Sequence, residues 1–152
     1  GNSRSQNALG IRYFRGEGVE KNYQEAVKWY RLSAENNYSW GQYNLGYMYD
    51  NGNGVVEDNK EAVKWYELAA KRGNSTAQFR LANQYREGSG VKKDDVYAYM
   101  WLKISSNKGY KKATEILNEL NDALTFQEIQ LANMLSDTCK ESKYKKCSLE
   151  DF

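Results

Sequence analysis

The run Glu25–Tyr30, which reads Glu-Ala-Val-Lys-Trp-Tyr, recurs residue for residue at Glu61–Tyr66, 36 positions further along the chain. At the same offset, a Gly-x-Gly-Val loop begins at Gly16, Gly52 and Gly88. Self-similarity at a fixed period of this length is the signature of stacked helical repeats. The sequence therefore predicts three copies of one helical unit.

Each unit predicts a helix, a loop and a second helix. Apolar and aromatic residues three and four apart, such as Leu45, Met48 and Tyr49, indicate the first helix. The second helix begins at Asn22 or Asp58, each followed three residues later by glutamate, as in a capping box. Asp94 or Asp95 holds this place in the third unit without a matching glutamate. The Gly-x-Gly pairs fit loops with positive φ, because no third glycine or Gly-Lys-Ser/Thr ending follows as a phosphate site requires.

Bulky residues keep the period as well. Trp29, Trp65 and Trp101 hold one position of the three second helices, on the same face as alanine and leucine. This placement predicts that the tryptophans pack in the core, rather than forming a ladder that stacks a ligand.

The pattern changes after Gly109, where a first helix continues but no Gly-x-Gly loop follows it. Thr125-x-x-Glu128 is a capping box that opens a last amphipathic helix. We therefore predict an all-α protein, a right-handed α-solenoid of antiparallel helix pairs forming a single domain over residues 1–152. Its expected parts are repeats at about 4–38, 39–74 and 75–110, a capping helix pair at 111–141 and a fraying tail at 142–152.

These residues resemble the Sel-one-like repeat (SLR) family, a relative of the tetratricopeptide repeat. The resemblance is carried by Gln42–Tyr49, the Gly52-x-Gly54-Val55 loop, Trp65-Tyr66 and Ala69-Ala70-x-x-Gly73. It implies an interaction scaffold or adaptor, with a bacterial host-interaction or envelope-associated role. The alternative is a cell-envelope enzyme with β-lactam or peptidoglycan-directed hydrolase activity, as linked to cysteine-rich members that carry a disulfide in each repeat.

Composition argues against an enzyme. The 152 residues include no histidine, which removes Ser-His-Asp and Cys-His catalysis and the common zinc sites. The one Ser-x-x-Lys sequence, Ser105 to Lys108, lacks the Lys-Thr-Gly and Ser-Asp-Asn motifs that accompany it in penicillin-recognising enzymes. Acidic pairs such as Asp94-Asp95 are explained as helix caps. We therefore assign no catalytic residue, no metal ligand and no cofactor.

Charge and hydropathy bear on the partner. The net charge is only +2 and its signs are interspersed, so no nucleic-acid footprint is present. The longest uncharged stretch, residues 36–49, is too short and too polar to span a membrane. We expect a protein or peptide partner and no small-molecule ligand. The lysine-rich segment at 140–146 is expected to be solvated.

The family's first helices line its concave surface. Leu45 and Tyr49 are expected to mark the buried side of their helix. Because successive residues of a helix are 100° apart, Trp40, Tyr43, Tyr47 and Asp50 then lie on the opposite face. Aromatic, amide and arginine side chains gather at these positions, as at a peptide-binding surface. The candidate groove residues are Ile11, Phe14, Trp40, Tyr43, Tyr47, Asp50, Phe79, Asn83 and Arg86. Tyr43 and Phe79 have a second interpretation, in which they pack between adjacent repeats.

Two cysteines, Cys139 and Cys147, lie near the C-terminus. In an unbroken helix they would be about 12 Å apart along the axis, so a disulfide between them requires a bend. The sequence leaves free thiols and a bridge equally open. It does not fix the compartment either, although the resemblance favours the bacterial periplasm, secretion or translocation over the cytoplasm.

Overall fold

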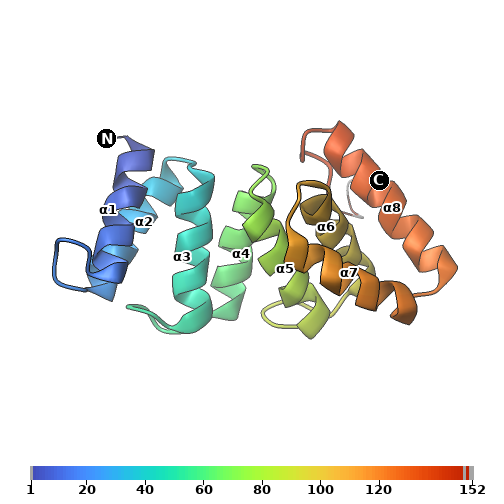
Figure 1. The fold of residues 1–152 in the computed structure, drawn as a ribbon, viewed down its shortest axis with the longest axis horizontal. Helices are drawn as coiled ribbons and strands as arrows, with labels where there is room; N and C mark the ends of the chain where they lie inside the picture. The colour runs from blue at the N-terminus through green and yellow to red at the C-terminus, as the bar shows by residue number, and fades with distance from the viewer. Residues whose placement is uncertain (1, 149, 151–152) are drawn as a thin grey trace. The chain divides into compact units, whose positions relative to one another are not determined.

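The predicted helices are present. In a computed structural model that describes residues 2–148 and 150, these residues form eight α-helices and no strand (Figure 1). The helices are α1 (Ser3–Arg15), α2 (Tyr23–Glu35), α3 (Ser39–Asn51), α4 (Asn59–Ala70), α5 (Ser75–Glu87), α6 (Asp95–Asn107), α7 (Lys111–Ala123) and α8 (Phe126–Glu141). None of the helices in the described part is both long enough and apolar enough to cross a membrane.

The capping residues begin the helices as the sequence indicates. Asn22 and Asp58 each accept a hydrogen bond at 3.0 Å from the backbone N–H of the residue three positions later. In the third repeat Asp94 is the cap, because its carboxylate accepts from the Tyr97 N–H at 2.9 Å. Thr125 and Glu128 form the reciprocal capping box at the start of α8. Local sequence therefore sets where these helices begin.

The chain divides into two compact units, Gly1–Ala69 and Ala70–Phe152. In the first unit α1 packs against α2, and α2 packs against α3. Its core consists of Ala26, Val27, Tyr30, Ala34, Leu45 and Met48. Gly10 allows α1 to approach α2 closely, since a Cβ there would lie 2.6 Å from the Tyr30 ring. The prediction of one domain over 1–152 is not tested by this division and stays a prediction.

In the second unit α6 is central, because α5, α7 and α8 all pack against it. This explains a difference within the tryptophan column. Trp101 on α6 is fully buried, whereas Trp29 on α2 and Trp65 on α4 are only half-buried. The predicted core packing is therefore complete only for Trp101. Trp65 is half-buried but packs against the core of the first unit, whereas Trp29 is half-buried and is not among the residues of that core. In the first two repeats, it is the next residue, Tyr30 or Tyr66, that is buried.

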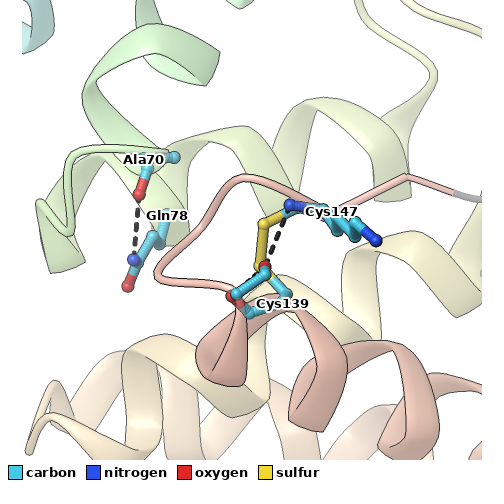
Figure 2. The surroundings of a disulfide bond; sticks show 6 residues. Ala70, Gln78, Cys139 and Cys147 are labelled. Carbon is cyan, nitrogen blue, oxygen red and sulfur yellow. Dashed lines mark hydrogen bonds between the residues drawn. A yellow bond between two sulfur atoms is a disulfide. The ribbon is translucent and has the colours of Figure 1, made fainter. Parts of the chain in front are cut away.

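The C-terminal segment folds back instead of fraying. After α8 ends, Lys143 and Tyr144 adopt positive φ values of 53° and 65°, which turn the chain. Cys139 and Cys147 then form a disulfide with their Cα atoms 4.5 Å apart (Figure 2), and both are buried. The bend that a bridge requires is therefore present. The expectation of a fraying tail is wrong for residues 142–148, while 149 and 151–152 lie outside the described residues.

The turned-back segment lies against the start of the second unit. The Lys108 ammonium group sits 4.9 Å from the centre of the Tyr144 ring and donates a hydrogen bond to the carbonyl oxygen of Gly73. Next to this turn, the Gln78 side-chain amide donates to the carbonyl oxygen of Ala70 at 3.1 Å (Figure 2). The disulfide thus holds a short loop against other residues of its own unit.

Candidate functional site

A cavity of about 330 Å³ opens in the first unit. Its walls come from α1, α2 and α3, and we call it the aromatic pocket. The lining residues are Asn7, Ile11, Phe14, Arg15, Tyr30, Trp40, Tyr43, Asn44, Tyr47 and Met48. Five of the nine predicted groove residues are among them, namely Ile11, Phe14, Trp40, Tyr43 and Tyr47. The helical spacing of these residues brings them to one place.

Two aromatic pairs form the walls of the aromatic pocket. The Phe14 and Tyr47 rings meet edge to face with their centres 6.1 Å apart, which joins α1 to α3. Trp40 and Tyr43 meet at 90° with their centres 5.8 Å apart. Trp40 is 45% exposed, an unusually high value for a tryptophan, so its indole is available to a partner.

Polar groups are set among these rings. The Asn44 side-chain amide donates a hydrogen bond to the Asn7 amide oxygen at 2.8 Å. The exposed guanidinium of Arg15 lies 3.4 Å from a carboxylate oxygen of Glu17. Tyr30 is only 3% exposed, and this burial raises the pKa of its hydroxyl far above the usual range, while Arg15 lowers it in part. Tyr30 is therefore a neutral phenol that can donate a hydrogen bond at any physiological pH.

The remaining predicted residues lie elsewhere. Asp50 does not line the aromatic pocket, and its carboxylate accepts a hydrogen bond from the Tyr66 hydroxyl at 3.1 Å. Phe79, Asn83 and Arg86 belong to the second unit. No observation tests these nine residues as a binding surface, so that assignment stays a prediction.

The second-unit residues are engaged with their own unit. Phe79 is buried and packs on the Tyr110 ring, with centres 5.0 Å apart. Arg86 lies 3.4 Å from a carboxylate oxygen of Glu119, and its side chain is 28% exposed. The side-chain oxygen of Asn83 is buried without a hydrogen-bond partner among the described residues. Arg86 and Asn83 are both half-buried, so these two offer more surface to a partner than Phe79.

Five lining residues are not among the nine candidates. Asn7 lies at a groove-facing position by helical spacing, whereas sequence reasoning missed Arg15, Tyr30, Asn44 and Met48. Tyr30 lies on the second helix, where the repeated spacing of apolar residues predicts a core position. It is indeed a core residue, and it also lines the aromatic pocket. A comparison of the repeats distinguishes Tyr30 from its equivalent, Tyr66. Asp50 accepts a hydrogen bond from the Tyr66 hydroxyl, and Phe14 stands at the position of Asp50 in the first repeat.

The chemistry of the aromatic pocket is that of recognition. Its described lining carries aromatic faces, two amides, the Tyr30 phenol and one cationic group, Arg15. Among the described residues, no group of three or more histidine, cysteine, aspartate or glutamate side chains is placed to hold a metal ion. Rigid aromatic side chains and arginine are the residues that most often anchor protein interfaces.

Comparison with known proteins identifies the repeat. The family model of the Sel1 repeat matches residues 3–38, 41–74 and 75–110. A Sel1 repeat protein from Oxalobacter formigenes is 38% identical, with a TM-score of 0.72 over 78% of this chain and 89% of that one. No curated protein matches the chain. These findings confirm the SLR resemblance and the all-α fold class.

A longer protein shares the same architecture. The antigen c5321, described as a protective antigen present in uropathogenic Escherichia coli strains and displaying an SLR fold, is 34% identical, with a TM-score of 0.85. The match covers 99% of this chain and 32% of the antigen, so the chain spans about a third of that protein's length. Helicobacter pylori cysteine rich protein B, at 22% identity and a TM-score of 0.65 over 75% of this chain and 90% of that one, shares the fold.

Proposed function

Because the chain belongs to the Sel1 repeat family, we propose that it is a scaffold that binds a peptide or protein segment at the aromatic pocket. Repeats of this family commonly mediate protein–protein interaction. The observation that carries the proposal is the exposed Trp40 indole at a cavity walled by Phe14, Tyr43 and Tyr47. Burying such an aromatic group against a partner removes apolar surface from water at little cost in side-chain entropy.

The proposal assigns no catalytic role. Ser105, the serine of the one Ser-x-x-Lys sequence, is fully buried, and its hydroxyl donates to the Ser75 carbonyl oxygen at 2.8 Å. Lys108 of the same motif donates to the Gly73 carbonyl oxygen. Both side chains are thus occupied in structure, and a substrate would have no access to the serine oxygen. A nucleophile needs an accessible oxygen and an adjacent base.

The biological setting is proposed from the relatives. They are bacterial proteins, and one of them is a protective antigen of a uropathogen. We place this chain likewise among bacterial host-interaction or envelope-associated factors. Phe79, Asn83 and Arg86 are proposed as additional partner contacts on the second unit.

Affinity capture tests the proposal. The wild-type chain, Trp40→Ala and Tyr47→Ala are immobilised and exposed to candidate partner proteins, and a captured protein is then titrated against each. Aromatic anchors of an interface cost about 2 kcal/mol or more on truncation, roughly a thirtyfold weakening. Lys28→Ala is the matched control, because Lys28 is exposed on α2 and contacts Glu25 instead of the aromatic pocket.

Thermal melts of each variant show whether the fold is retained. The proposal is supported if binding falls in the two aromatic variants and persists in the lysine variant. It is wrong if Lys28→Ala loses binding while both aromatic variants keep it.

A further inference from the structure

The second repeat contains a buried phenol bound to a carboxylate. Tyr66 on α4 is fully buried, and its hydroxyl donates a hydrogen bond to Oδ2 of Asp50 on α3 at 3.1 Å. The ring lies against Gly46, where a Cβ would come within 2.8 Å of it. A buried hydroxyl costs free energy unless it is hydrogen-bonded, and here the carboxylate satisfies it.

The first repeat keeps the phenol but lacks the carboxylate. Tyr30 occupies the position 36 residues before Tyr66 and packs in the same way on Gly10. The residue 36 positions before Asp50 is Phe14, which cannot accept a hydrogen bond. Among residues 2–148 and 150 no group forms a hydrogen bond with the Tyr30 hydroxyl. The residue as a whole is only 3% exposed, but its hydroxyl oxygen is not among the buried polar atoms that lack a partner, so this oxygen reaches solvent.

The aromatic pocket lies at this solvent-accessible hydroxyl. Tyr30 and Phe14 both line it, and so does Arg15, the one charged residue among its described lining. Arg15 acts electrostatically on the Tyr30 phenol. Its contact with Glu17 joins two exposed groups, 62% and 57% exposed, and such pairs are weak. The lining therefore offers a donor and a cation to an anionic guest.

We propose that the aromatic pocket binds a protein segment through an aspartate or glutamate side chain. Its carboxylate accepts a hydrogen bond from Tyr30 and pairs with Arg15, and so takes the place that Asp50 fills in the second repeat. The inference rests on the proposed scaffold function and names the chemistry of its partner. A charge-assisted hydrogen bond together with an ion pair offsets the cost of removing a carboxylate from water.

The aromatic walls of the pocket also indicate which kind of residue lies next to the acidic residue in the partner segment. Trp40 stands 45% exposed at the aromatic pocket, at a right angle to Tyr43. An apolar side chain next to the inserted acid would cover the indole and exclude water from the ion pair. The partner segment is therefore one in which an acidic and an apolar residue are adjacent.

Synthetic peptides test this inference directly. The immobilised full chain is incubated with pools of N-acetylated, C-amidated nonapeptides with uncharged random flanks around a central Leu-Glu, Leu-Gln or Leu-Lys pair. A further pool ends in leucine with a free carboxylate. The retained fraction of each pool is measured by mass spectrometry at low and high salt, because salt screens the contact with Arg15.

We expect the Leu-Glu pool to be retained about threefold or more above the Leu-Gln pool, and the Leu-Lys pool least. Arg15→Gln and Tyr30→Phe should each reduce this preference toward equality. Tyr30→Phe removes only a hydroxyl without a protein partner, so melting curves should show an intact fold. Lys28→Gln, which removes a positive charge from the exposed face of α2, should keep the preference.

Three results would overturn the inference: equal retention of the Glu and Gln pools, a preference for lysine, or stronger retention of the free-carboxylate pool. If the Glu and Gln pools bind equally and both are lost in Trp40→Ala, the scaffold function stands and only the acidic specificity is wrong. If no pool is retained above a blank surface, the acidic specificity and the peptide-binding function both fail at this site.

Discussion

The Asn44 side-chain amide donates a hydrogen bond at 2.8 Å to the amide oxygen of Asn7, and this contact ties α3 to α1 across one repeat. Asn7 is only 7% exposed, so water cannot readily replace its partner. The two residues do not occupy equivalent places, since the residue 36 positions after Asn7 is Tyr43 and not Asn44. The contact is therefore particular to this pair of helices and helps to fix the aromatic pocket that both residues line.

We predict that Asn44→Leu destabilises the protein, because it leaves the buried Asn7 acceptor without its donor. Such a loss costs about 1–3 kcal/mol. Urea unfolding followed by circular dichroism measures it, with the exposed Lys60→Ala on α4 as the control that should change stability by less than about 0.5 kcal/mol. If the two variants unfold at the same urea concentration, the hydrogen bond contributes nothing to the fold.

The tryptophan column should give unequal losses. Trp101→Ala removes a fully buried side chain from α6, which three helices cover, and is expected to cost about 3–5 kcal/mol. Trp65→Ala removes a half-buried ring whose indole N–H donates a hydrogen bond to the Glu61 carboxylate at 3.0 Å. Because less of this ring is buried, the loss of unfolding free energy should be about half as large. Urea midpoints of the two variants provide the comparison. A larger loss for Trp65 would restore the core role that the sequence period indicates.

This inequality shows what the period can predict. The 36-residue repeat and the capping residues locate the helices because both depend on neighbours in the sequence. How deeply a tryptophan is buried depends on how many helices pack against its own. That number differs between α2, in the first unit, and α6, although Trp29 and Trp101 occupy the same repeat position.

The aromatic pocket was predictable to the same extent. Trp40, Tyr43 and Tyr47 were found because they share one face of one helix, which sequence spacing alone determines. Tyr30 was missed because it reaches the aromatic pocket from the second helix of its repeat, where the spacing of apolar residues predicts a core position. Arg15 was missed because no residue of the other two repeats carries an arginine at its position.

Acid should weaken the start of α8. The Glu128 carboxylate accepts hydrogen bonds from the Thr125 backbone N–H at 2.8 Å and from the Thr125 hydroxyl at 2.9 Å. The backbone hydrogen bond, followed by the hydroxyl, lowers the pKa of Glu128 below its usual value. A carboxyl whose pKa is lower in the folded state stabilises the fold above its unfolded pKa, and this contribution is lost as the pH falls through the folded value.

Glu128→Gln should therefore unfold more easily than the wild type at neutral pH, and the difference should shrink as the solution is acidified. Thermal melts over a pH series measure both effects. Glu115→Gln is the control, because Glu115 lies exposed on α7 and its difference from wild type should stay small throughout. A Glu128 difference that does not change with pH would show that the carboxylate charge plays no part in the capping box.

Reduction should release the C-terminal loop. The disulfide joins residues eight apart, and closing a loop of this size removes about 2–3 kcal/mol of unfolded-state entropy. The melting temperature should therefore fall when reductant is added to the wild type. The double variant Cys139→Ser with Cys147→Ser should melt at this lower temperature with or without reductant.

Limited trypsin digestion adds a local readout, since Lys143, Lys145 and Lys146 lie within the loop. Cleavage there should be slow in the oxidised chain and fast in the reduced one, because the bridge keeps the loop against Lys108 and Gly73. Equal cleavage rates in the two states would mean that packing of Tyr144, and not the disulfide, holds the segment in place.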